Sequence, residues 1–202
     1  DLLDVYDTVK DRMGKVERVL VNTLEAPAKF SVPAGMTDLK DAYAADVPTS
    51  KPAVTLDENG ILMLMYTSGT TGLPKGVVNR YNKNAIDRVK PLAGILLKPD
   101  SIYYTALQLF HGNALFITIT GSLLVGCTVA LSKKFSASKF WEEVARSKAT
   151  IFNTIGAIIP ILMKTPESPY DKNHCVKSIL SAGCPAILWE PFEQRFGVKI
   201  WE

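Results

Sequence analysis

Cysteine and histidine are scarce in this 202-residue sequence, which has three cysteines and two histidines. Cys127, Cys175 and Cys184 are odd in number and show no CxxC spacing, which disfavours a disulfide framework and a zinc ribbon. Two histidines are too few for a histidine-rich metal site. The unpaired thiols, together with the lack of a signal peptide, predict a cytoplasmic protein.

The sequence also lacks an excess of charge of either sign. Lys and Arg number 23 and Asp and Glu number 20, which gives a formal net charge of +3. This balance argues against nucleic acid or an anionic membrane as the partner. Hydrophobic residues make up 47% and charged residues 21%, so intrinsic disorder is excluded. The length suits one large domain or a tight pair.

One stretch without formal charge, His111 to Ser132, is long enough to cross a bilayer. However, small and polar residues interrupt it, among them Gly121 and Gly126. A buried helix that ends near Leu124, followed by a buried strand over 127–131, explains the same composition. We therefore predict no transmembrane segment.

Residues 1–60 are expected to form a connector and peripheral elements. Apolar spacing predicts a helix over 2–9, and residues 19–21 predict a short strand. A further short helix is expected after Thr37, with the hydroxyl of this residue as its N-cap. Prolines and glycines punctuate most of the rest.

Residues 61–202 alternate between strand and helix patterns. The continuous apolar run 61–66 predicts a strand buried on both faces. Further strands are expected over 102–105, 129–131, 150–153, 178–181 and 198–200, and helices over 79–90, 112–124, 136–148, from 160, and over 189–196. Pro91 is expected to end the first of these helices, and Pro191 is expected in the first turn of the last. The pattern predicts an α/β fold, a mostly parallel sheet with helices on both faces.

The strongest chemical signal is the segment 67–76, Thr-Ser-Gly-Thr-Thr-Gly-Leu-Pro-Lys-Gly, expected between a buried strand and a helix. Its glycines allow close backbone approach, and its hydroxyls and N–H groups can surround phosphate oxygens while Lys75 adds a positive charge. It differs from the P-loop of nucleoside triphosphatases, because Gly76 follows Lys75 where that motif has Ser or Thr. The simpler alternative is an ordinary turn rich in Ser, Thr and Gly.

These ten residues resemble the phosphate-loop signature of the adenylate-forming, or AMP-binding, superfamily, which includes acyl-CoA synthetases, nonribosomal-peptide adenylation domains and luciferases. Leu109–Asn113 resembles the next motif of that family, an aromatic–histidine pair beside the acyl pocket. Ser181–Pro185 resembles the segment that lines the adenine ring, and Phe192–Val198 resembles the approach to a Tyr-Gly-x-Thr-Glu motif. The likeness is good from residue 56 onward, and is closest to acyl-CoA synthetases of the crotonobetaine/carnitine-CoA ligase type.

The resemblance assigns roles to particular residues. The β- and γ-phosphates of ATP would be bound by Thr67, Ser68, Gly69, Thr70, Thr71, Gly72 and Lys75. One wall of the adenine slot would be Gly183, Cys184 and Pro185, and the acyl pocket would include His111, Asn113, Phe152 and Thr154. Lys75 and His111 would be catalytic. The alternatives are structural: His111 satisfied in a crowded interior, Phe152 as plain core, Cys184 as a small buried residue, and His174 at the surface.

The family's Tyr-Gly-x-Thr-Glu motif, with the glutamate that holds magnesium, is not in the sequence, nor is the mobile domain with its catalytic lysine. The chain is therefore expected to be part of the large N-terminal domain, with no metal ligand of its own and no turnover by itself. The intact enzyme would use ATP, Mg²⁺ and coenzyme A. Apolar residues around the expected pocket favour a fatty or aromatic acid.

Two other functions remain open. One is an adenylation domain that charges a carrier protein, and the other is a nucleotide-binding module without chemistry. Domains that activate amino acids normally present an acidic residue to the substrate amine. No Asp or Glu lies between Phe110 and Ser132, which weighs against that type of domain.

Overall fold

The computed structural model describes residues 2–45, 55, 57–67, 72–81 and 83–202. The chain divides into two compact units, 1–54 and 55–202, each of which is considered by itself. The predicted functional division after residue 60 stays a prediction.

The first unit is small and carries little core. It contains helix α1 (Leu2–Val9), a 3₁₀ turn η1 (Lys10–Arg12), the short parallel strands β1 (Leu20–Val21) and β2 (Thr37–Asp38), and helix α2 (Leu39–Ala44). The predicted helix 2–9 and the strand near 20 are both present. Val21 is the one buried apolar side chain among the described residues of this unit.

The predicted cap of the second helix is wrong by one residue. Asp38 is the N-cap of α2, and its carboxylate accepts hydrogen bonds from the Lys40 backbone N–H (2.9 Å) and the Thr23 hydroxyl (2.7 Å). These two bonds lower the pKa of Asp38. Thr37 pairs with Leu20 in the two-stranded ladder instead, which holds it in extended backbone one residue before the cap.

The apolar run that begins at residue 61 forms an exposed hairpin. Strand β3 (Ile61–Thr67) pairs antiparallel with β4 (Lys75–Arg80), and Thr67 lies opposite Lys75. Ile61 and Tyr66 are 61% and 66% exposed, so the prediction of a strand buried on both faces is wrong. The prediction of a helix directly after the glycine-rich loop is also wrong there, because the chain returns as a second strand.

Helix α3 (Lys83–Leu96) starts later and runs past Pro91. The expected end before Pro91 is therefore wrong. Proline removes one N–H donor from the helix ladder, but the bonding continues beyond it, since Leu97 N–H donates to Ala93 O at 2.8 Å. Pro91 is exposed, so its ring occupies the solvent side of the helix.

The remaining strands form one five-stranded sheet that is parallel throughout, as the sequence predicts. Its order is β6-β5-β7-β8-β9. The bounds are β5 (Ile102–Thr105), β6 (Thr128–Leu131), β7 (Ile151–Ile155), β8 (Ser178–Ala182) and β9 (Lys199–Trp201). From β5 the chain first adds β6 on one side and then adds all later strands on the other side.

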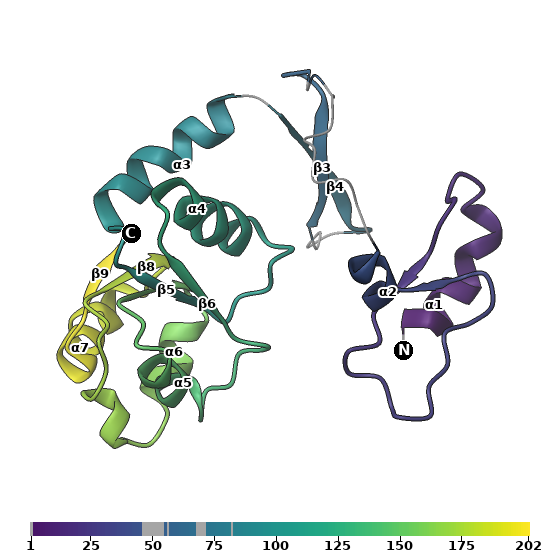
Figure 1. Ribbon diagram of the computed structural model, residues 1–202. Coiled ribbons are helices and arrows are strands. Elements are labelled where there is room, and N and C mark those ends of the chain that lie inside the picture. Colours follow the sequence, from purple (N-terminus) through teal and green to yellow (C-terminus); the bar gives the residue numbers. More distant parts are fainter. Residues whose placement is uncertain (1, 46–54, 56, 68–71, 82) are drawn as a thin grey trace. The chain divides into compact units, whose positions relative to one another are not determined.

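Helices cover both faces of this sheet (Figure 1). On one face lie α3 and a π-helix, η2 (Asn113–Thr120), which continues into α4 (Gly121–Val125). On the other face lie α5 (Phe140–Arg146), α6 (Ile158–Met163) and α7 (Ala186–Phe196). A 3₁₀ turn, η3 (Pro169–Asp171), lies in the connection between α6 and β8. Among the described residues, no helix is both long and apolar enough to cross a membrane.

Two apolar cores follow from this layering. The larger one packs aromatic and aliphatic side chains of α5, α6 and α7 against the sheet, with Phe140, Trp141, Phe152, Phe192 and Phe196 at its centre. The smaller one, on the opposite face, joins Tyr103 and Ile151 to Ala93 and Leu97. Successive residues of a strand point to opposite faces, so β5 and β7 each supply both cores.

The last helix is longer than predicted. It begins at Ala186, which places Pro191 in its interior rather than in its first turn. Pro191 is exposed, as Pro91 is, so each ring lies away from the core. The predicted end is confirmed, because Gly197 closes the helix in the left-handed conformation with φ of 69°.

Candidate functional site

The carboxyl ends of four neighbouring strands meet at one edge of the sheet, because the strands are parallel. The loop after β5 leads to His111, the loop after β7 begins at Gly156, the loop after β8 holds Gly183, and β9 is followed by Glu202. At this edge the connection that leaves β5 runs to β6, whereas the connection that leaves β7 runs the other way, to β8. In open α/β sheets such a point forms the crevice where ligands bind.

The backbones after β7 and β8 press directly against each other. Gly156 N–H donates to Ala182 O at 2.8 Å. A side chain at Gly156 would overlap the carbonyl oxygen of Gly183, and Gly183 itself has φ of +89°. Both positions therefore require glycine. Sequence reasoning identified Gly183 and missed Gly156, although a glycine directly after a buried strand is a usable signal.

Cys184 and Pro185 follow at the same edge. The Cys184 N–H donates to Glu202 Oε2 at 2.8 Å, which ties the loop after β8 to the end of β9. Burial, and then the nearby carboxylates of Glu202 and Glu193, raise the pKa of the Cys184 thiol. A raised pKa favours the neutral thiol over the thiolate near neutral pH. Glu202 was missed, because only the strand register shows that it reaches Cys184.

The four residues predicted for the acyl pocket do not lie together on one face of the sheet. Asn113, at the start of η2, accepts a hydrogen bond from the Asn153 amide of β7. Phe152 and Thr154 are fully buried on the opposite face, where Phe152 packs edge-on against Phe140. Phe152 thus lies in the hydrophobic core, as the structural alternative for this residue describes.

Asn153 is a polar residue in a central strand that sequence reasoning passed over. It is 3% exposed, and its Oδ1 has no hydrogen-bond partner in the described part of the chain. A buried acceptor without a partner costs free energy, so such atoms in native proteins call for an explanation. Asn153 is hydrogen-bonded to Asn113, the residue that follows Gly112. The two amides together are therefore a candidate contact for a polar group of a ligand.

His111 lies exposed in the loop after β5, with its ring 4.6 Å from that of Phe110. Phe110 is 66% exposed. A histidine satisfied in a crowded interior, the structural alternative, is therefore not what the structure contains. The side chains of Phe110 and His111 are therefore both accessible to solvent at the edge of the sheet.

The other histidine is less exposed than the sequence suggests. His174 is half-buried and stacks on Trp141, with ring centroids 4.7 Å apart. Its Nδ1 accepts from Val176 N–H at 3.2 Å, so the proton lies on Nε2, 3.1 Å from Phe196 O. Burial lowers the pKa of His174. Its role is structural.

The predicted phosphate loop lies between β3 and β4. Ser68, Gly69, Thr70 and Thr71 fall outside the described residues. Thr67 ends β3 and its hydroxyl donates to Lys75 O at 3.4 Å, while Gly72 and Lys75 are exposed.

Comparison with known proteins places these features in a family. The family model "AMP-binding enzyme" matches residues 5–202. The chain is 35% identical to "Medium/long-chain-fatty-acid--CoA ligase FadD6" of Mycobacterium tuberculosis, over 78% of the chain and 27% of that protein. It is 36% identical to "Very long-chain fatty acid transport protein" of Cochliobolus heterostrophus, over 98% of the chain and 30% of that protein.

Solved structures share the fold. The anthranilate CoA ligase AuaEII, in complex with anthranoyl-AMP, matches 98% of the chain and 38% of its own, with a TM-score of 0.80 and 20% identity. The N-terminal domain of FACL13 from Mycobacterium tuberculosis matches with a TM-score of 0.70 and 23% identity. The chain spans less than a third of the length of the two curated relatives named above. It belongs to the AMP-binding, adenylate-forming enzyme family and corresponds to part of the N-terminal domain.

Proposed function

We propose that the intact protein is an AMP-forming acid–thiol ligase that activates a fatty acid with ATP and transfers the acyl group to coenzyme A. The main support for this proposal is that the family match includes every predicted motif, from the loop at 67–76 to the segment at 181–198. The fatty-acid preference is supported by relatives above 30% identity, one of which is named a medium/long-chain fatty-acid CoA ligase. The names of several others refer to fatty acid transport.

The reaction has two steps. A carboxylate oxygen of the acid attacks the α-phosphorus of ATP, and the bond from that phosphorus to the bridging oxygen breaks, which releases pyrophosphate. The sulfur of coenzyme A then attacks the acyl carbon, the bond from that carbon to the AMP oxygen breaks, and the thiol proton leaves. Both steps need alignment of the reactants and neutralisation of the negative charge that develops on the leaving group.

The residues of this chain would supply alignment and charge. Lys75 and the backbone N–H groups of its loop would hold the leaving pyrophosphate. The glycine contact at 156 and 183 leaves bare backbone at the sheet edge, against which a flat base can lie without meeting a side chain. His111 and the Asn113–Asn153 pair would flank the carboxylate. Magnesium would neutralise phosphate charge when bound, and none of its ligands is assigned to this chain.

The proposal is tested on the full-length protein by ATP–pyrophosphate exchange with a panel of medium-chain, long-chain and aromatic acids. We expect exchange with fatty acids, and thioester formation once coenzyme A is added. If none of the acids supports ATP–pyrophosphate exchange, the proposal is overturned. Exchange followed by transfer to a carrier protein, but not to coenzyme A, would support the carrier-protein alternative instead.

The role of Lys75 is tested separately with Lys75→Ala. Loss of a charged hydrogen bond of about 1.5–3 kcal/mol should lower kcat/KM for ATP by roughly 10- to 150-fold. The matched control is Lys98→Ala, an exposed lysine that precedes β5 and so lies at the opposite, amino edge of the sheet. Equal kcat/KM for ATP in both variants would remove the phosphate role of Lys75.

A further inference from the structure

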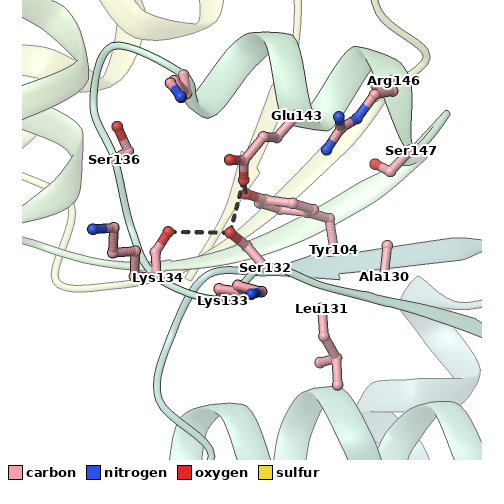
Figure 2. Close-up of a pocket in the computed structure, with 11 residues that line it drawn as sticks. Tyr104, Ala130, Leu131, Ser132, Lys133, Lys134, Ser136, Glu143, Arg146 and Ser147 are labelled. Carbon is pink, nitrogen blue, oxygen red and sulfur yellow. Dashed lines mark hydrogen bonds between the residues drawn. The ribbon is translucent and has the colours of Figure 1, made fainter. Parts of the chain in front are cut away.

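A second hollow, of about 590 Å³, lies between the edge strand β6 and helix α5. Figure 2 shows its lining, which combines the end of β6, the loop that follows it and one side of α5. Its charged residues are Lys133, Lys134, Lys139, Glu143 and Arg146. None of the residues predicted to bind ATP or the acyl group lines it.

The single carboxylate in the lining is already engaged by neutral donors. Glu143 Oε2 accepts a hydrogen bond from the Tyr104 hydroxyl at 2.9 Å and another from the Ser132 hydroxyl at 2.7 Å. Tyr104 is 3% exposed, and burial is the main cause that raises its pKa. The Ser132 hydroxyl also lies 3.1 Å from Lys134 O. This network joins β5, the loop after β6 and α5, and it fixes the shape of the wall.

The lining of this hollow carries an excess of positive charge. Four cationic side chains and one carboxylate give the lining a formal charge of +3, which equals the net charge of the whole sequence. The other residues of the chain therefore sum to zero. The exposed cations come from two elements, since Lys134 follows β6 while Arg146 lies in the last turn of α5. Cations from two elements that line one hollow can contact several oxygens of one anion.

We propose that this hollow, defined by Ser132–Lys134, Lys139, Glu143 and Arg146, binds a phosphate group at a site separate from the proposed ATP site. The chemistry fits a phosphate group carried by a small molecule or by a phospholipid headgroup. Arg146 offers a planar pair of donors to phosphate oxygens, and Lys134 and Lys139 add positive charge. The proposal does not depend on the ligase function, since it needs only the residues of the hollow.

The test uses the full-length protein and a triple variant, Lys134→Gln, Lys139→Gln and Arg146→Gln. Two probes separate the sources of phosphate: inorganic phosphate, followed by calorimetry, and vesicles of phosphatidylcholine with phosphatidic acid, followed by co-sedimentation. The control, Lys98→Gln with Lys177→Gln, removes exposed lysines that precede β5 and β8 and lie outside the hollow. Thermal melting verifies that each variant is folded.

We expect the triple variant to weaken binding of at least one probe by about tenfold or more, as for lost charged hydrogen bonds, while the control binds like the parent. Loss with both probes or with vesicles alone supports a headgroup, and loss with inorganic phosphate alone supports a small molecule. Glu143→Gln, which keeps an oxygen acceptor but removes the negative charge, should tighten binding. Absence of binding by the parent, or equal loss in the control, overturns the proposal. Loss of probe binding in Lys75→Ala would also overturn the proposal, since the probes would then be binding at the proposed ATP site.

Discussion

Strand β3 has the more apolar sequence of the two strands β3 and β7, yet it is far more exposed. In β7, Ile151, Phe152 and Thr154 are at most 2% exposed, whereas in β3 Ile61 and Leu64 are 61% and 53% exposed. β7 has a parallel neighbour on each side and helices over both faces, while β3 pairs with β4 alone in the part of the chain that the structure describes. An apolar run thus specifies a strand, but its burial depends on which other elements pack against it.

The same contrast separates the two parts of the candidate site. His111 and Gly183 are attached to strands of a packed sheet, whereas Lys75 begins a strand of a two-stranded hairpin. Isolated two-stranded hairpins are marginally stable in water. The packed part is therefore suited to holding its loops in fixed positions, and the hairpin is expected to open at a lower free energy.

The largest expected effect comes from emptying the core under β7. Phe152→Ala removes a fully buried ring that packs against Phe140 and Trp141. We expect a loss of about 3–5 kcal/mol in the free energy of unfolding, measured by chemical denaturation. A loss below about 1 kcal/mol would contradict the description of this strand as the centre of the core.

A smaller effect is expected where two strand ends touch. Gly156→Ala would place a methyl group against the Gly183 carbonyl, so we expect a loss of about 1–3 kcal/mol in the free energy of unfolding. The control is Gly94→Ala in α3, where an added Cβ meets nothing within 4 Å. This change should stabilise the helix by up to about 1 kcal/mol. Equal effects of the two substitutions would argue against the close backbone contact.

Lowering the pH is expected to destabilise the unit that holds the sheet through His174, and not through the residues of the hairpin. The folded-state pKa of His174 is lowered by burial, so below pH about 6.5 the unfolded chain binds more protons than the folded one. The contribution of His174 to stability is then complete above pH about 6.5 and is lost as the pH falls from there toward the folded-state pKa. Protonation also removes the acceptor for Val176 N–H.

The measurement is the free energy of unfolding from pH 7.5 to pH 5.5 for the parent and for His174→Gln. The parent should lose stability over this window by more than the variant does. Residues 61–80 contain no His, Asp or Glu, so the hairpin has no group that titrates there. An identical pH dependence in parent and variant would exclude His174 as the source.

The smallest effect is expected in the hairpin. Leu64→Ser replaces a side chain that is 53% exposed, and exposed substitutions usually change stability by no more than about 0.5 kcal/mol. The comparison with Phe152→Ala is made by chemical denaturation under identical conditions. A large loss for Leu64→Ser would show that β3 is covered in solution and would remove the contrast between the two strands.

Most of the fold could be predicted from the sequence because alternating strand and helix patterns are local. The parallel sheet, its five strands and the helix end at Gly197 follow from apolar runs and glycine positions. The helices that contain Pro91 and Pro191 could not be predicted in full, since each proline faces solvent and costs only a local bond. Strand β4 was missed because its pairing with β3 is a property of both strands together.

The candidate site shows the same limit. His111, Gly183 and Cys184 lie on loops at the carboxyl edge of the sheet, and their roles in binding stay predictions. Gly156 and Glu202 could not be found by motif, because they matter through contacts across strands, with Gly183 and Cys184 respectively. The register that creates those contacts is set by the packing of the whole sheet.

The order of the strands also constrains how the protein is made. The N–H of Ile102, the first residue of β5, bonds to the Thr150 hydroxyl just before β7, 48 residues later in the chain. During synthesis β5 therefore emerges well before its central partner, and β6 is the first strand it can pair with. Contacts of such long sequence separation form slowly, so the inner edge of β5 is open to wrong partners until the ribosome has delivered β7.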